Sequence, residues 1–168
     1  MVRRREHPSG YTLVEVMLVV VILGILASVG ARMLLQVNRY FIMANAKADI
    51  QREARAAMYV ITSEVRQAQA STIVIDSASP TEPFYSRITF TILNGPTLTF
   101  WQNGTQLIQS VNGGATVLSN HVQYLAFTLP RSDDMTILSV ALTLQENIYQ
   151  GRSKALHMAS EQIQVMNP

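Results

Sequence analysis

One acidic side chain stands inside the most apolar stretch of this sequence. Glu15 lies in the run from Tyr11 to Ala31, where nearly all other residues are apolar or small. As a helix, this run spans roughly 31 Å, the thickness of the hydrocarbon core of a bilayer. A carboxylate in hydrocarbon is unfavourable by about 2.5 kcal/mol or more, so it usually marks a function with a specific partner.

The position of Glu15 indicates what that partner is. A cut after Gly10 would create an α-amino group at Tyr11, four residues before the carboxylate. Positions i and i+4 lie on one face of a helix, so the ammonium and the carboxylate can meet there. Within one chain they would partly neutralise each other. Between neighbouring chains, the same attraction would fix the axial register of packed helices.

The segment Gly10–Glu15 reads Gly-Tyr-Thr-Leu-Val-Glu, after a short basic leader and before the apolar run. This pattern resembles the type IV prepilin processing site of pilins and of the pseudopilins of type II secretion. The resemblance implies cleavage by prepilin peptidase after Gly10, N-methylation of Tyr11 and assembly of the helix into a filament core. The family most often has Phe or Met after the cut, and Tyr11 is a tolerated departure.

Two other interpretations of this segment remain open. A secretory signal peptide also has a basic start and an apolar core, and Ala27-Ser28 has the small residues of its cleavage site. However, this apolar run is longer than such a core and carries Glu15 at its entrance. The segment is alternatively a simple single-pass anchor with an incidental glutamate.

The charges and the lack of cysteine limit the remaining possibilities. The leader holds three of the 13 basic and one of the 11 acidic side chains, so its removal would leave a balanced chain. We read this basic excess as a signal that keeps the leader cytoplasmic and exports the C-terminal region. Cysteine is absent, which excludes disulfides and modestly favours a pseudopilin or minor subunit over a major pilin.

A single long helix is predicted from about Tyr11 to about Ala70. Residues 32–70 contain no Pro or Gly and are rich in good helix formers. Apolar residues recur there at steps of four and three, which predicts one buried face. These residues are Ile50, Ala54, Met58, Ile61, Val65 and Ala68.

The pattern changes to that of β-strands after Ser71. Alternating apolar residues predict strands over 72–75, 87–93, 97–101, 106–111, 122–129, 136–145 and 155–165. Asn94-Gly95 and Asn103-Gly104 indicate tight turns, and Gly113-Gly114 is expected to break the chain. A loop is expected around Gln150-Gly151-Arg152. The predicted buried residues of the later strands are Leu125, Phe127, Leu129, Leu138, Val140, Leu142 and Leu144.

The expected fold class is therefore α+β, a long N-terminal helix on an antiparallel sheet of five to seven strands, which is the pilin architecture. Four segments follow: a leader at 1–10, a transmembrane or filament-core helix at 11–31, an amphipathic continuation at 32–70 and a β-rich domain at 71–168.

We expect no enzyme activity, no cofactor and no metal. His121 and His157 are interpreted as partly exposed strand histidines, because nothing nearby in the sequence supplies converging ligands. Asp133-Asp134 is ordinary turn chemistry, with calcium contact as the alternative. No catalytic motif such as G-x-S-x-G or H-E-x-x-H is present.

Two surface hypotheses concern the region beyond Ser71. Phe84, Tyr85, Phe100 and Trp101 either pack in the core or form an exposed sticky patch. Nucleic-acid binding is not expected, since the only basic residues there are Arg87, Arg131, Arg152 and Lys154.

These observations favour a minor pilin-like subunit anchored once in the inner membrane, with its C-terminal domain periplasmic or extracellular. Its expected partners are other pilins or pseudopilins through residues 11–31, prepilin peptidase, an inner-membrane assembly platform, and lipid before assembly. Residues 63–68 and the β-rich remainder look most similar to J-type minor pseudopilins. The alternative is an envelope-anchored binding domain that does not polymerise. A third interpretation, a secreted enzyme, would need a polar cluster that the sequence does not show.

Overall fold

The computed structural model describes residues 10–131, 134–149 and 153–167. The chain forms two compact units, with the boundary between Ile42 and Met43. Residues 1–9 of the expected leader at 1–10, Asp133 and the loop at 150–152 lie outside the described residues.

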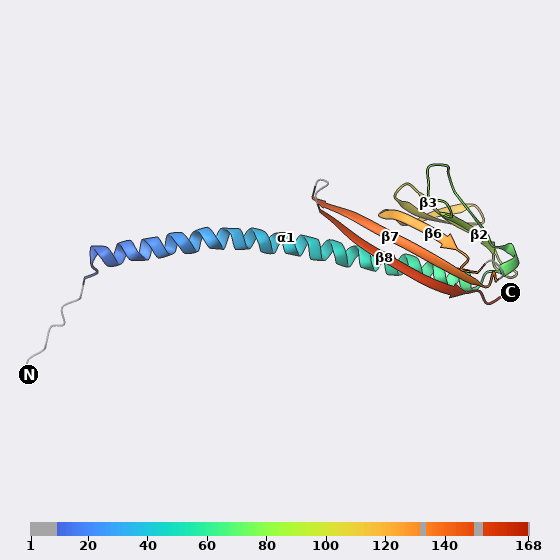
Figure 1. The fold of residues 1–168 in the computed structure, drawn as a ribbon, viewed down its shortest axis with the longest axis horizontal. Helices are drawn as coiled ribbons and strands as arrows, with labels where there is room; N and C mark the ends of the chain where they lie inside the picture. Colours follow the sequence, from blue (N-terminus) through green and yellow to red (C-terminus); the bar gives the residue numbers. More distant parts are fainter. Residues whose placement is uncertain (1–9, 132–133, 150–152, 168) are drawn as a thin grey trace, which may run out of the picture. The chain divides into compact units, whose positions relative to one another are not determined.

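Helix α1, Leu13–Arg66, runs through the first unit and into the second (Figure 1). It ends four residues before the predicted end, and Ala70–Thr72 form a short 3₁₀ turn instead. Between Leu13 and Ile42 every described side chain is exposed, although most are apolar. Of the described helices, α1 is long and apolar enough to cross a membrane.

From Met43 on, α1 buries a single stripe of side chains. All six residues that the sequence predicted for this face are buried, although Ala68 lies just beyond the helix end. They share one hydrophobic cluster with the inner faces of the strands. The period of 3.6 residues per turn explains this, since only one side of the helix can contact a sheet.

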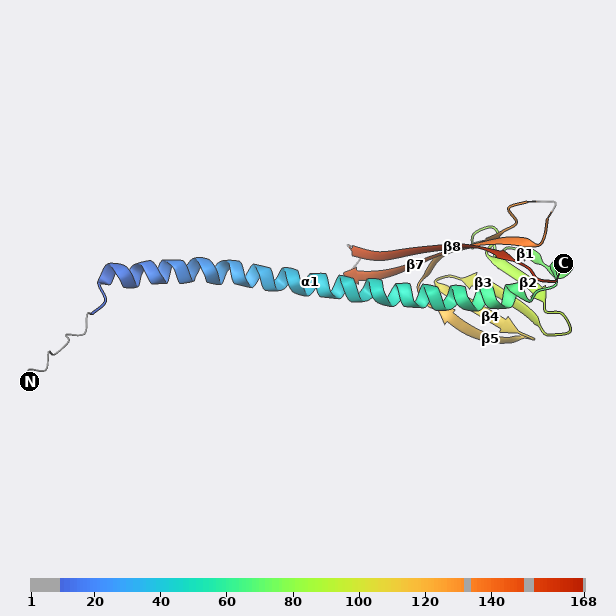
Figure 2. The same ribbon diagram turned by 90° about the horizontal axis from the view of Figure 1, so that it is seen from below.

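The strands form two antiparallel sheets, each with sequential strand order (Figures 1 and 2). The five-stranded sheet contains β1 Val74–Asp76, β2 Arg87–Thr91, β3 Thr97–Asn103, β4 Gln106–Val111 and β5 Gly114–Ser119. The three-stranded sheet contains β6 Val122–Thr128, β7 Ile137–Tyr149 and β8 Ser153–Gln164. The α+β class is confirmed, but the strands are divided between two sheets rather than one.

Strand β5 is absent from the predicted strands, because Gly113-Gly114 indicates a break in the sequence. In the structure Asn112 and Gly113 form a two-residue turn with φ angles of 50° and 90°. Positive φ at both central residues is the signature of a type I′ hairpin turn. Val111 therefore pairs with Gly114, and the chain returns as β5 along β4.

The two sheets are joined by buried polar groups. The side chain of Gln102, only 4% exposed, accepts a hydrogen bond from Leu125 N–H at 2.9 Å and donates one to the Gly104 carbonyl at 2.9 Å. The carbonyl of Tyr85 accepts from Phe127 N–H at 2.9 Å. These bonds tie β3 and the loop before β2 to β6, the nearest strand of the other sheet.

The predicted buried strand residues are almost all in the core. Leu125, Phe127 and the four alternating residues of β7 are fully buried, whereas Leu129 is half-buried. The aromatic residues divide between the two hypotheses: Phe100 is buried and stacks near Phe90, and Phe84 and Tyr85 are exposed.

Candidate processing and assembly segment

The start of α1 is fixed by Thr12. Its hydroxyl accepts a hydrogen bond from Glu15 N–H at 3.3 Å, and its carbonyl accepts from Val16 N–H at 3.2 Å. Thr12 is therefore the N-cap, and Thr-x-x-Glu is the spacing of a capping box. This signal is present in the sequence, and it would have set the helix start two residues later than predicted.

Gly10 and Tyr11 precede the helix and are exposed, with Tyr11 at 83%. The uncut chain consequently does not place Tyr11 one helical turn above Glu15. The peptide bond between Gly10 and Tyr11 lies outside the helix, which begins at Leu13.

The carboxylate of Glu15 is exposed in the first turn of α1. Among the residues that the structure describes, no side chain pairs with it. The helix N-terminus carries a partial positive charge, so it favours an anion at this position and disfavours a bare ammonium. After a cut, a carboxylate here would offset the charge of a new amino terminus.

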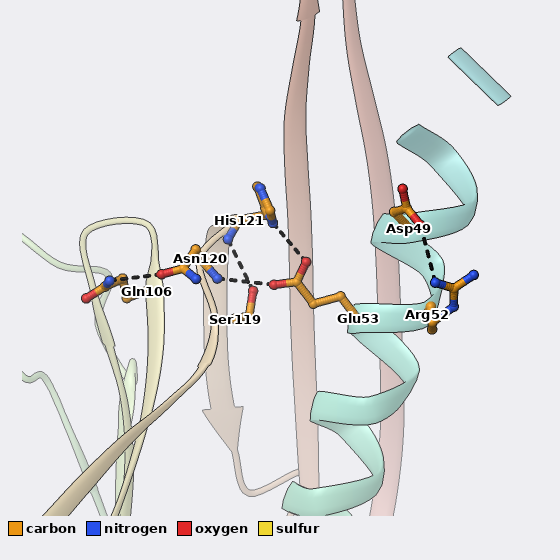
Figure 3. A network of polar contacts seen from close by, with 7 residues as sticks. All are labelled: Asp49, Arg52, Glu53, Gln106, Ser119, Asn120 and His121. Carbon is orange, nitrogen blue, oxygen red and sulfur yellow. Dashed lines mark hydrogen bonds and ion pairs between the residues drawn. The ribbon is translucent and has the colours of Figure 1, made fainter. Parts of the chain in front are cut away.

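A cluster of polar side chains surrounds Glu53 of α1 in the second compact unit (Figure 3). Glu53 accepts a hydrogen bond from Asn120 N–H at 3.1 Å and contacts His121 Nδ1 at 2.8 Å. Burial alone raises the pKa of Glu53, but hydrogen bonds from His121, Ser119 and Asn120 outweigh it and hold that pKa below its ordinary value. Glu53 thus anchors the helix to the corner between β5 and β6.

His121 is partly exposed, as expected, and it also has an acidic neighbour, Glu53. Sequence reasoning missed Glu53 because it lies 68 residues away along the chain. Two groups do not make a metal site, and no cluster of three or more His, Cys, Asp or Glu occurs among the described residues. Asp134 accepts hydrogen bonds from Thr136, as expected for a turn.

Comparison with known proteins gives one match. Residues 7–31 match the family described as the prokaryotic N-terminal methylation motif. No curated protein and no solved structure matches the chain. This motif is the prepilin signal of type IV pilins and pseudopilins, so the expected resemblance is confirmed at that level.

The motif and the exposed apolar helix together support a single-pass, membrane-anchored protein that carries a prepilin-type N-terminal signal. The long helix followed by antiparallel sheets is a pilin-like arrangement. Such proteins are structural subunits rather than enzymes as a rule.

Proposed function

We propose that this chain is a minor pilin-like structural subunit of a type II secretion pseudopilus or a type IV pilus. Prepilin peptidase cuts it after Gly10, Tyr11 becomes N-methylated, and residues 11–31 then enter a filament core. The observation that carries this proposal is the N-terminal methylation motif at 7–31, joined to the exposed apolar part of helix α1 at residues 13–42.

The physical basis for assembly is the exposed apolar surface of residues 13–42. Before assembly, this surface is covered by lipid, in which apolar side chains are stable. In a filament, neighbouring helices replace the lipid, so extraction from the bilayer does not wet the apolar surface. The C-terminal unit would lie in the periplasm or outside the cell, with an inner-membrane platform driving the transfer.

Glu15 would set the register of this packing by pairing with the Tyr11 amino group of an adjacent subunit. An isolated carboxylate among packed apolar helices is unfavourable, and pairing removes much of that cost. Misregistered packing leaves both charges unpaired. The finer placement as a J-type subunit at a filament tip is part of this proposal and rests on the resemblance of residues 63–68 and the β-rich remainder.

Replacement of Glu15 by Gln tests this role in the native host. The variant Glu15→Gln keeps the backbone N–H that donates to Thr12, so the helix start is preserved while the charge is lost. We expect normal processing and a decrease of about tenfold or more in the amount recovered in sheared filaments, because the ion pair with the Tyr11 amino group of an adjacent subunit is lost. A tenfold decrease corresponds to about 1.4 kcal/mol. Glu15→Asp keeps the charge and should lose less.

The alternative function, an anchored domain that never polymerises, gives a different result. It predicts that the Glu15→Gln variant and the wild-type chain have the same location and the same activity, with neither found in filaments. If the wild-type chain and the Glu15→Gln variant enter filaments equally well, the register role is contradicted.

A further inference from the structure

Helix α1 carries a second stripe of side chains, beside the one that enters the core. Arg55, Tyr59, Thr62 and Arg66 follow one another at spacings of four, three and four residues, which places them on one side of the helix. Tyr59 is 76% exposed, and both arginines are exposed. An exposed tyrosine between two arginines differs from the small and charged residues usual on a solvated helix face.

This stripe forms one wall of a groove between α1 and β8. The groove has a volume of about 620 Å³, and its lining also includes Met58, Ser63, Gln67, Glu161 and Met166. Thr62 Oγ1 donates to Glu161 Oε2 at 3.0 Å, which fixes β8 beside the helix (Figure 1). A neighbouring hollow of about 530 Å³ shares Arg66 and Met166, so the depression continues along β8.

The charges of the groove are unbalanced. The lining holds two arginines and one carboxylate, that of Glu161. Neither arginine forms an ion pair among the described residues, and one oxygen of Glu161 accepts a hydrogen bond from Thr62. The two arginines are eleven residues apart, or roughly 16 Å along the helix axis. The lining therefore combines the apolar side chains of Met58, Tyr59 and Met166 with an excess of one positive charge, since Arg55 and Arg66 stand against the single carboxylate of Glu161.

We propose that this groove docks a segment of another polypeptide that carries apolar side chains between two carboxylates. Arg, Tyr and Met are enriched in protein interfaces, and Tyr and Arg are, with Trp, enriched among the residues that dominate binding energy. Arginine binds carboxylate in a planar, bidentate manner, which favours an acidic partner. The groove lies in the second compact unit, which begins at Met43, so docking there does not depend on processing of the N-terminus.

Two other occupants fit less well. A flat bilayer surface cannot fill a recess whose floor is the buried Met58. A second copy of this chain offers few free carboxylates, because most of its described acidic groups already accept bonds within the chain. These are Asp49, Glu53, Asp76, Glu82, Asp134 and Glu161.

The test replaces Tyr59 by the photo-crosslinking residue p-benzoylphenylalanine in the full chain, expressed in its native host. After irradiation, the adduct is digested and its peptide is sequenced by mass spectrometry. We expect a peptide from a different protein with apolar residues and an excess of Asp and Glu. Arg55→Glu together with Arg66→Glu should reduce its yield by about tenfold or more.

Two control variants, a fluorescence measurement and a compensating change in the partner separate docking from folding. Arg52→Glu reverses an exposed charge on the same helix, away from the groove lining, and should leave the yield unchanged. Arg55→Lys with Arg66→Lys keeps the charges and should retain part of the yield. The fluorescence of Trp101, measured on each purified chain, reports whether the fold is intact. An Asp or Glu of the captured peptide changed to Arg should restore capture by the doubly reversed chain.

Four results would overturn the proposal. They are an adduct with lipid, an adduct with another copy of this chain, no adduct in a correctly folded chain, and a yield that the double charge reversal does not change. In each case, processing after Gly10 and filament entry stay measurable in the same cells, so the proposed function is judged separately.

Discussion

Two carboxylates on α1 are accommodated in opposite ways. Glu53 is partly buried, with its side chain 25% exposed, and it receives hydrogen bonds from the corner between β5 and β6. Glu15 lies in the first turn, exposed, and no side chain among the described residues pairs with it. The first carboxylate is therefore a structural tie within one chain, whereas the second is suited to a partner from outside the chain.

We expect Glu53→Gln to destabilise the C-terminal unit by about 1 kcal/mol at pH 7, because a charged acceptor of two hydrogen bonds is lost. The pKa of Glu53 is lower in the folded chain than its ordinary value of 4.5. Its contribution is therefore present above that value and disappears as the pH falls through the lowered pKa. Denaturant unfolding of the detergent-solubilised chain, followed by Trp101 fluorescence, measures the difference.

The free energy of unfolding of wild type and of Glu53→Gln should be compared at pH 7 and at about pH 3.5, because the difference between the two chains should depend on pH. The gap between wild type and Glu53→Gln should narrow at the lower pH, and a gap that is constant or wider would contradict it. Arg52→Ala is the matched control on the same helix. Its pair with Asp49 is well exposed, so its loss should change the free energy of unfolding by less than about 0.5 kcal/mol.

At the scale of elements, the hairpin between β4 and β5 depends on one backbone conformation. Gly113 has a φ of 90°, which an L-residue with a Cβ adopts only with strain. Gly114 follows it directly and has no positive φ, and a Cβ there would lie at 3.5 Å from the Val111 carbonyl, an ordinary contact. The two adjacent glycines therefore have different roles.

We expect Gly113→Ala to lower the free energy of unfolding by about 1 kcal/mol through this strain. Gly114→Ala is the matched control and should have a clearly smaller effect. Equal losses at both positions, measured by denaturant unfolding with Trp101 as the probe, would mean that the turn conformation is not the cause.

The elements can be predicted where the periodicity of side chains is strong. The buried stripe from Ile50 to Val65 and the alternation from Leu138 to Leu144 each follow directly from the geometry of a helix or a strand. The prediction missed strand β5 because it placed the turn signal at Gly113-Gly114, one residue later than the actual turn. The packing of the two sheets against each other depends on contacts of β3 and of the loop before β2 with β6. Contacts between residues so distant in sequence leave no local pattern, so the sequence does not predict them.

The candidate sites show the same contrast between local sequence signals and contacts of distant residues. Glu15 was visible because a charge in an apolar run stands out without any tertiary information. The contact between Glu53 and His121 and the groove beside Tyr59 were not visible, because each joins the helix to strands that follow much later in the sequence. In the sequence, the arginines of the groove look like ordinary solvated charges. Only the structure, which places β8 beside them, shows that they line a groove.

At the scale of the whole molecule, the two units suit different surroundings. Residues 13–42 expose apolar side chains along the helix, whereas the second unit buries a core of its own. A protein with this division requires lipid or other helices around its first unit. Under the proposed function, the N-terminal methylation motif at 7–31 directs the processing that precedes transfer of the first unit from lipid to a filament core.

The most direct test of this account is the mass and sequence of the mature N-terminus, measured on protein made in its native host. We expect a chain that begins at Tyr11 and is heavier by one methyl group on its α-amino nitrogen. A chain that retains Met1, or one that begins near Val29 after cleavage by a signal peptidase, would contradict prepilin processing and with it the assembly role of Glu15.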